Sequence, residues 1–141
     1  MGTNYLTTGP ITQNEMNHFF KKMGTRTDTG GHSLFLGQVR ADETGGKKVI
    51  AIEYTAYEGL IIPEAEKIKD SILSEFYDVK SIDILHSIGV VKTGEISLMV
   101  LVSAGHRHHA VEACSRAVEL IKERFPVWKK ELFNDNSQRW K

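Results

Sequence analysis

The chain has 141 residues, which is about the size of one domain, and its 40% hydrophobic share is ordinary for a globular protein. Its 18 Lys and Arg residues balance 18 Asp and Glu residues, which argues against a general nucleic-acid coat protein. The charge is unevenly distributed, because residues 1–104 carry 10 basic and 13 acidic side chains whereas residues 105–141 carry 8 and 5. An anion-binding site is therefore expected near the carboxyl end.

Cys114 is the only cysteine, so no internal disulfide can form and a reducing compartment is expected. No stretch approaches the roughly 18 consecutive apolar residues that cross a bilayer, and residues 1–10 lack the pattern of a secretion signal. We therefore expect a cytoplasmic protein that does not contact a membrane.

The first half of the chain predicts a helix followed by two strands. A capping box at Thr12 and Glu15 opens an amphipathic helix that Gly24 ends. A loop over 25–32 leads to a strand at 33–40, and a second strand runs over about 48–57. Residues 43–47 between these strands are predicted to form a hairpin tip.

The second half predicts two more helices and a buried strand. A helix is expected over 64–77, with Pro63 in its first turn, and strands are expected on either side of Gly89 and Gly94. The nearly continuous apolar run at 96–103 indicates a central strand covered on both faces. A further helix, at about 106–124, stops at Pro126.

These elements predict a single α+β domain over 1–141 with a mainly antiparallel sheet and helices packed on it. Residues 1–32 form its amino-terminal helix and loop. Residues 127–141 form a basic and aromatic tail that is too apolar to remain in water, so it is expected to dock on this subunit or on a second copy.

Several possible functional motifs are weak. The pairs Gly30-Gly31 and Gly45-Gly46 fit neither nucleotide-loop pattern and are better interpreted as turns. The three histidines between 106 and 109 lack a second cysteine or a carboxylate at ligand spacing, so no metal site is predicted. Cys114 lies in the apolar stripe of its helix, where core packing is favoured over a nucleophilic role.

A set of cationic residues is the strongest candidate site. His106 and Arg107 lie where a buried strand ends and a helix begins, a junction at which main-chain N–H groups and the helix dipole favour an anion such as phosphate. Crowded positive charges would also lower the pKa of a lysine and make it a better base or nucleophile. The alternative is a solvated basic helix end. The set comprises Arg40, His106, Arg107, Lys122, Lys129 and Lys130.

Several segments resemble, in order and spacing, the catalytic (large) subunit family of molybdopterin synthase. They are 35–40 (FLGQVR), 53–57 (EYTAY), 86–89 (HSIG), 94–95 (GE), 103–107 (SAGHR), 122–131 (KERFPVWKKE) and 139–140 (RW). The similarity covers most of the chain. Two positions depart from the family pattern: Ser87 stands where an arginine is usual, and Leu60 lies near a position usually held by methionine.

The resemblance implies a hammerhead-like α/β fold and a sulfurtransferase of molybdenum cofactor biosynthesis. Such an enzyme converts cyclic pyranopterin monophosphate to molybdopterin, with two sulfurs delivered as thiocarboxylates on the C-terminal Gly-Gly of a small ubiquitin-like carrier. The resemblance also implies a homodimer with one carrier at each end, a heterotetramer in all. It implies no cofactor and no metal for the sulfur step.

By the same resemblance, Lys122 is the central catalytic amine and Lys129 assists it. Arg139 is expected to serve a neighbouring subunit, and Phe35 is expected to contact the carrier tail, with core packing as the alternative. The residues implied to bind the substrate are Gln38, Val39, Arg40, His106, Arg107, Lys130 and Glu131.

Two other functions remain open at this stage. The basic and aromatic tail could stack single-stranded RNA in a non-enzymatic binding module, although such modules usually carry a larger basic surplus. The chain could also be an inactive or regulatory homologue of the synthase, a hypothesis that Ser87 permits.

Overall fold

The computed structural model describes residues 5–141, which form three helices and eight strands. The helices are α1 (Gln13–Met23), α2 (Glu58–Glu75) and α3 (Arg107–Arg124). The strands are β1 (Leu6–Thr8), β2 (Gly31–Gln38), β3 (Glu43–Thr44), β4 (Lys47–Ala56), β5 (Val79–Lys92), β6 (Ile96–Ala104), β7 (Val127–Phe133) and β8 (Gln138–Trp140). The predicted α+β class is confirmed. Within the described chain, β1 with β5 is the only parallel pair.

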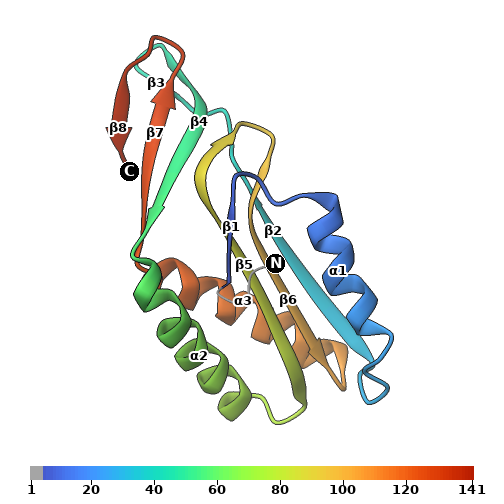
Figure 1. Ribbon diagram of the computed structural model, residues 1–141. Coiled ribbons are helices and arrows are strands. Elements are labelled where there is room, and N and C mark those ends of the chain that lie inside the picture. Colours follow the sequence, from blue (N-terminus) through green and yellow to red (C-terminus); the bar gives the residue numbers. More distant parts are fainter. Residues whose placement is uncertain (1–4) are drawn as a thin grey trace.

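The strands follow the order β2-β6-β5-β4-β7-β8, with β1 added to β5 and β3 to β4. The first part of β5 pairs with β6, and its last part pairs with β4, so this strand connects two halves of the sheet. Gly89, whose φ is 84°, lies where β5 passes between them. We call β1, β2, β5 and β6 the large sheet and β3, β4, β7 and β8 the small sheet, which projects beyond the large one (Figure 1).

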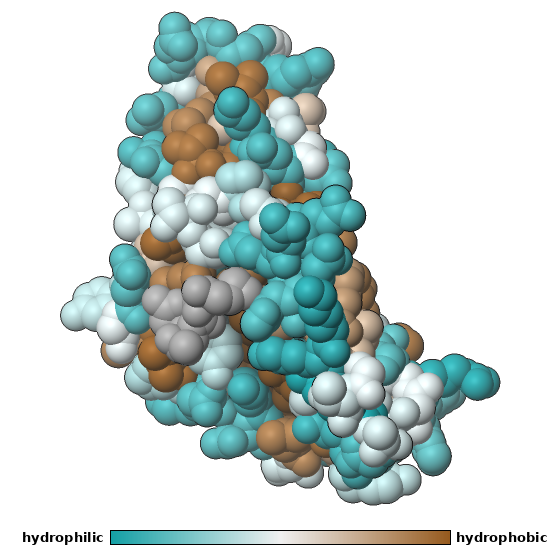
Figure 2. Space-filling model, turned by 45° about the vertical axis from the view of Figure 1, so that its right-hand side comes forward, coloured by the Kyte–Doolittle hydropathy of each residue, from teal (hydrophilic) through white to brown (hydrophobic). Residues whose placement is uncertain are grey.

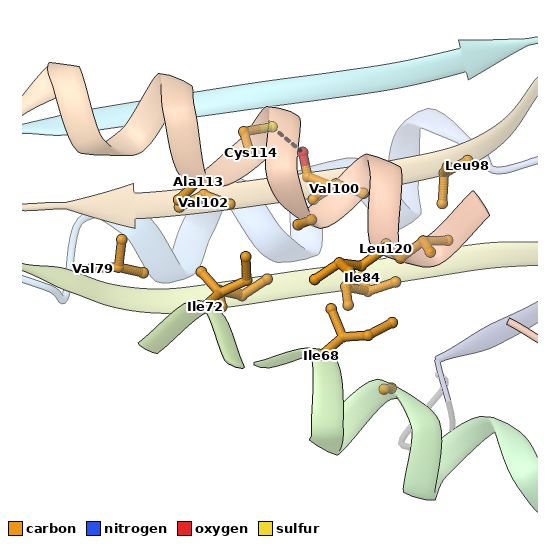
Figure 3. Close-up of a cluster of buried hydrophobic side chains, with 14 of the residues drawn as sticks. Ile68, Ile72, Val79, Ile84, Leu98, Val100, Val102, Ala113, Cys114 and Leu120 are labelled. Atoms are coloured by element: carbon orange, nitrogen blue, oxygen red, sulfur yellow. Dashed lines mark hydrogen bonds between the residues drawn. The ribbon is translucent and has the colours of Figure 1, made fainter. Parts of the chain in front are cut away.

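β6 is the central strand of the large sheet and is buried on both faces, as its apolar run predicts. On one face, Val100 and Val102 pack with Ile68 and Ile72 of α2 and with Leu120 of α3 (Figure 3). The other face, which includes Met99 and Leu101, packs with Phe19 of α1. Burial of side chains of this size stabilises the fold by about 1.5–3 kcal/mol each.

Helix α1 begins as its sequence predicts. Thr12 is its N-cap and forms a reciprocal capping box with Glu15, and Gly24 ends the helix. The cap satisfies backbone donors that a helix start otherwise leaves unpaired. Phe19 then points from the helix to the sheet, so α1 covers the face of the large sheet opposite α2 and α3.

Helix α2 begins earlier than predicted. It starts at Glu58, where the Leu60 N–H donates to the Tyr57 carbonyl, so Pro63 lies inside the helix instead of in its first turn. Pro63 is exposed. The carbonyl left without an N–H donor by Pro63 is that of Gly59, which is also exposed. Of the extra residues, Ile61 is buried and belongs to the apolar stripe, whereas Glu58, Gly59 and Leu60 are exposed, so the stripe does not mark the first residues of the helix.

The hairpin tip at Gly45 and Gly46 is confirmed, with φ values of 58° and 80° at the two glycines. Residues 127–141 dock on their own chain as strands: β7 pairs with β4, and β8 pairs with β7. Their aromatic and basic composition therefore serves the small sheet directly. Residues 1–4, which lie in the predicted amino-terminal segment, are outside the described residues.

Hydrophobic side chains on the face in Figure 2 lie in separate patches among hydrophilic ones. Within residues 5–141, no helix combines the length and apolar character that a membrane crossing requires. The predicted cytoplasmic location remains a prediction.

Candidate active site

A cavity of about 340 Å³ lies where the two sheets meet the carboxyl end of α3. Each of these elements contributes part of its wall, so residues far apart in sequence meet there. From β2 and the loop after it come Phe35, Leu36, Gly37, Gln38, Arg40 and Asp42; from the other strands Ile52, Tyr54, His86, Ser97, Leu98, Val127, Lys129 and Glu131; from α3 and the residue after it Ile121, Lys122 and Phe125; and from the residue after β8 Lys141.

Three amines, those of Lys122, Lys129 and Lys141, give the cavity its positive charge. None of them makes an ion pair with the described residues 5–141. Burial lowers the pKa of Lys129 below its usual value, and the charges of Lys122 and Lys141 lower it further. The cavity therefore attracts anions and holds one lysine that loses its proton more readily than usual.

The two acidic side chains at the cavity are already paired. Asp42 accepts a hydrogen bond from Arg40 Nε at 2.6 Å. Glu131 accepts from Arg139 Nε at 3.1 Å and from Arg139 Nη2 at 2.8 Å. Because these carboxylates face guanidinium groups, the three amines keep their surplus charge.

The floor of the cavity is polar but uncharged. The Tyr54 hydroxyl donates to Ser97 Oγ at 3.0 Å, and both residues are buried. His86 lies beside Tyr54, with ring centroids 5.3 Å apart and the rings nearly perpendicular. Phe125 lies on another side of the imidazole, with a centroid distance of 6.2 Å.

A second hollow, of about 400 Å³, lies at the amino end of α3 and is lined by Gly30 and residues 105–108. Gly30 and Gly31 let two backbones approach: a Cβ on Gly30 would lie 2.5 Å from the Gly105 oxygen, and one on Gly31 would lie 2.8 Å from Arg107 Cα. The sequence alone favours ordinary turns at these glycines. In the structure, both positions must be glycine because a larger side chain would clash with the backbone of Gly105 or Arg107 at the predicted anion-binding junction.

Asp78 fixes the backbone at the junction between β6 and α3. Its carboxylate accepts a hydrogen bond from the His106 N–H at 3.1 Å and pairs with His109 Nδ1, while its carbonyl accepts from the Gly105 N–H at 2.9 Å. Burial raises the pKa of Asp78, but the contacts with His109 and His106 outweigh it, so the pKa lies below its usual value. The backbone entering α3 is therefore fixed by the carboxylate of Asp78, the residue just before β5.

The predicted site residues separate into two groups within one chain. Phe35, Gln38, Arg40, Lys122, Lys129 and Glu131 line the cavity. His106 and Arg107 lie at the opposite end of α3, and fifteen residues of helix put Arg107 about 22 Å from Lys122 along the axis. Within one copy of the chain, the predicted cationic residues therefore do not gather in a single hollow.

Three other predicted residues lie outside the cavity wall. Val39 is 2% exposed and packs with Val49 and Val91 in the small-sheet core. Arg139 pairs with Glu131 of its own chain. Lys130 faces the other side of β7, where its amine lies 4.6 Å from the Trp140 ring centroid and 3.9 Å from a Glu53 oxygen.

Strand alternation explains why Lys129 and Lys130 differ. Successive side chains of a strand point to opposite faces, so Val127, Lys129 and Glu131 line the cavity while Trp128 and Lys130 do not. The sequence motif contains both lysines. Only the strand assignment shows that Lys129 lines the cavity and Lys130 does not.

Several cavity residues were not predicted from the sequence. Tyr54 and His86 belong to segments of the family resemblance, which gave them no role. Ser97 and Asp42 carried no distinguishing pattern. Lys141 reaches the cavity because its N–H donates to the Lys129 carbonyl at 2.8 Å, an extension of the β7-β8 pairing that composition could not reveal.

Cys114 belongs to the core, as expected. It is 3% exposed, its Sγ lies 3.8 Å from the Val100 carbonyl, and burial raises the pKa of its thiol (Figure 3). Ser87 is fully buried, and its hydroxyl lacks a hydrogen-bond partner in the described part of the chain. Leu60, the other departure from the family pattern, is exposed, so a different side chain is easily accommodated. The same residues 5–141 contain no group of three or more His, Cys, Asp or Glu side chains arranged to hold a metal ion.

Comparisons with known proteins agree with this fold. Residues 6–124 match the family model described as MoaE protein. The chain is 41% identical over 129 residues to the molybdopterin synthase catalytic subunit of Dictyostelium discoideum, covering 90% of this chain and 80% of that protein. The corresponding subunit of Pyrococcus abyssi is 43% identical over 114 residues, covering 81% and 75%. Some relatives are longer: the chain spans 30% of the Drosophila willistoni protein.

Solved structures of molybdopterin synthase and molybdopterin-converting factor have the same fold as this chain. Molybdopterin synthase from Staphylococcus aureus superposes with a TM-score of 0.87 at 28% identity, over 100% of this chain and 98% of that one. A Helicobacter pylori complex of molybdopterin-converting factor subunits 1 and 2 shares the fold, with a TM-score of 0.78 at 21% identity over 96% and 87%. Fold and cavity define an α+β enzyme subunit with a lysine-rich, anion-attracting site. The chain belongs to the MoaE family of molybdopterin synthase catalytic subunits.

Proposed function

We propose that this chain transfers sulfur to cyclic pyranopterin monophosphate, using two sulfurs from the thiocarboxylated C-terminal Gly-Gly of a small ubiquitin-like carrier. The observation that supports the proposal is the set of three amines around one cavity that make no ion pair with residues 5–141. A thiocarboxylate and a cyclic phosphate repel each other, and fixed positive charge offsets that repulsion as they approach.

Lys122 is the central catalytic amine in this proposal, and Lys129 assists it. The lowered pKa of Lys129 supports its role, because a larger share of its side chain is unprotonated near neutral pH and can accept a proton. Arg40 and Gln38 bind the substrate at the rim, and Phe35 contacts the carrier tail. The sulfur step uses no metal and no cofactor.

A homodimer brings the second group of residues into the site. His106 and Arg107 lie too far from Lys122 along α3 to share a ligand within one chain. In a twofold dimer the amino end of α3 from one copy can lie beside the cavity of the other, where Arg107 can bind phosphate oxygens with two parallel hydrogen bonds. The carrier then completes a heterotetramer, a proposal supported by the two-subunit composition of the Helicobacter pylori complex that shares this fold.

Reconstitution with the thiocarboxylated carrier and cyclic pyranopterin monophosphate tests the activity. The expected product is molybdopterin; an inactive homologue makes none. Binding to single-stranded RNA that weakens steeply with salt, without sulfur transfer, would instead support the binding-module alternative. The exposed Trp128 and Trp140 are the side chains such a module would use.

Mixing two inactive variants tests the shared site. Lys122→Ala and Arg107→Ala subunits, dissociated and reassociated together, should recover about a quarter of the wild-type activity. Half of the dimers are then mixed, and each mixed dimer holds one intact site of two. No recovery from reassociated dimers would show that Arg107 does not act across the interface.

A further inference from the structure

His86 is a titratable side chain on the floor of the cavity that the proposed sulfur transfer does not use. It is 6% exposed, yet it forms part of the cavity wall. Its Nδ1 lies 2.7 Å from the Ser87 carbonyl oxygen. Because a carbonyl only accepts hydrogen bonds, Nδ1 must carry the proton.

The other ring nitrogen is therefore an acceptor when the imidazole is neutral. Burial lowers the pKa of His86 to about 4, and the charges of Lys129 and Lys122 act in the same direction. The ring is thus uncharged near neutral pH. Of the two ring nitrogens of His86, only Nδ1 has a hydrogen-bond partner within residues 5–141.

The neighbours of His86 leave its Nε2 to a ligand. Tyr54 directs its hydroxyl to Ser97 and presents its ring to the imidazole. Phe125 also presents a ring. His86 Nε2 is not one of the fully buried polar atoms without a partner, so it stays accessible from the cavity, and a ligand N–H can donate to it in partly apolar surroundings where a hydrogen bond is stronger than in water.

The cavity therefore has two chemically different parts: a rim of three amines for anionic groups, and an uncharged floor where His86 Nε2 can accept a hydrogen bond. We propose that His86 is a specificity-determining residue whose Nε2 accepts a hydrogen bond from an N–H group of the substrate's uncharged heterocycle. This inference rests on the proposed function, because it takes a phosphorylated heterocycle as the substrate. It fixes the orientation of that substrate, with the ring toward the floor and the phosphate toward the rim.

Imidazole ¹⁵N resonances of the wild-type protein test this without any substitution. At neutral pH the Nε2 signal should lie at the position of an unprotonated nitrogen and move upfield when cyclic pyranopterin monophosphate is added. A pterin without a phosphate group should also move it, whereas inorganic phosphate should not. An unmoved signal at saturating substrate, or equal shifts with inorganic phosphate, would overturn the inference.

Three substitutions provide the kinetic test in the reconstituted enzyme. His86→Phe keeps a ring but removes both nitrogens, His86→Asn keeps an amide donor only near the Nδ1 position, and His86→Gln extends an amide oxygen toward the Nε2 position. We expect KM for the pterin to rise about tenfold in the Phe and Asn variants and about threefold or less in the Gln variant, with carrier binding unchanged. Equal KM values in the Phe and Gln variants would contradict the role.

The two proposals fail in different ways. If the wild-type protein makes no molybdopterin, the proposed function fails, and the resonance shift with the phosphate-free pterin still reports on the floor. If the wild-type protein is active but its Nε2 resonance stays unchanged, only the role of His86 fails. Should His86→Phe not fold, the spectra of the wild-type protein decide the question.

Discussion

Gly31 and Arg107 are in backbone contact, with the position of a Cβ on residue 31 falling 2.8 Å from Arg107 Cα and 2.9 Å from its N. The start of β2 therefore sets the position of the first turn of α3. The predicted anion-binding junction depends on a residue that has no side chain.

Replacing Gly31 with alanine should destabilise the protein, because a backbone cannot yield as a flexible side chain does. We expect the free energy of unfolding to fall by about 1–3 kcal/mol in chemical denaturation. Gly24→Ala is the matched control, since Gly24 has a φ of −67° and a Cβ added there would meet nothing within 4 Å. That control should stay within about 0.5 kcal/mol of the wild type, and an equally small effect at Gly31 would contradict the contact.

Lys122→Ala should abolish molybdopterin formation without unfolding the protein. Lys122 is exposed at the end of α3, so its removal changes little packing, while the cavity loses one of its three amines. We expect turnover to fall by at least about 100-fold, the usual scale for loss of a catalytic proton-transfer group. The control is Lys67→Ala, an exposed lysine of α2 outside the cavity, which should keep full turnover. Retained activity in the Lys122 variant would refute its catalytic assignment.

Arg139→Ala should destabilise the small sheet because it leaves the buried Glu131 carboxylate without its two donors. The expected loss is about 1–3 kcal/mol of unfolding free energy. Adding Glu131→Gln in the same chain should recover part of that loss, because a neutral amide needs less compensation. Strict additivity of the two single effects in this double-mutant cycle would show that the pair does not interact.

His86 should make stability depend on pH. Its folded-state pKa of about 4 lies below the ordinary histidine value, so between those two pH values the unfolded chain binds more protons than the folded one. Stability should therefore fall on acidification from about pH 6.5 to pH 4, by up to about 3 kcal/mol, and this contribution should level off below pH 4. Denaturation midpoints measured across this range in the wild type and in His86→Phe provide the comparison. An unchanged slope in the variant would assign the pH dependence to other groups.

Much of the large sheet and its helices can be predicted from the sequence. The spacing of apolar residues within each short segment indicates which faces of the helix or strand are buried. The capping box at Thr12, the uninterrupted apolar run of β6 and the small residues of α3 each indicate what lies beside them. The start of α2 at Glu58 could not be predicted, since Glu58, Gly59 and Leu60 are solvent-exposed and carry no core pattern. Likewise, β1 is too short for a local pattern and exists through its pairing with β5.

The candidate site is less predictable because it depends on distances between elements. The cationic set and the family resemblance identify Lys122 and Lys129, but not the separation of Arg107 from Lys122 along α3. The floor residue His86 has no local mark of its role. Its properties arise from a carbonyl beside it and from aromatic rings on β4 and after α3.

The junction after α3 leaves little tolerance for changes in chain length. The Pro126 carbonyl accepts a hydrogen bond from the Tyr57 N–H at 3.0 Å, and β7 begins at the next residue. Inserting or deleting one residue there would turn Lys130 inward and Lys129 outward, along with every other side chain of β7. Natural or engineered relatives can therefore vary the composition of this connection far more readily than its length.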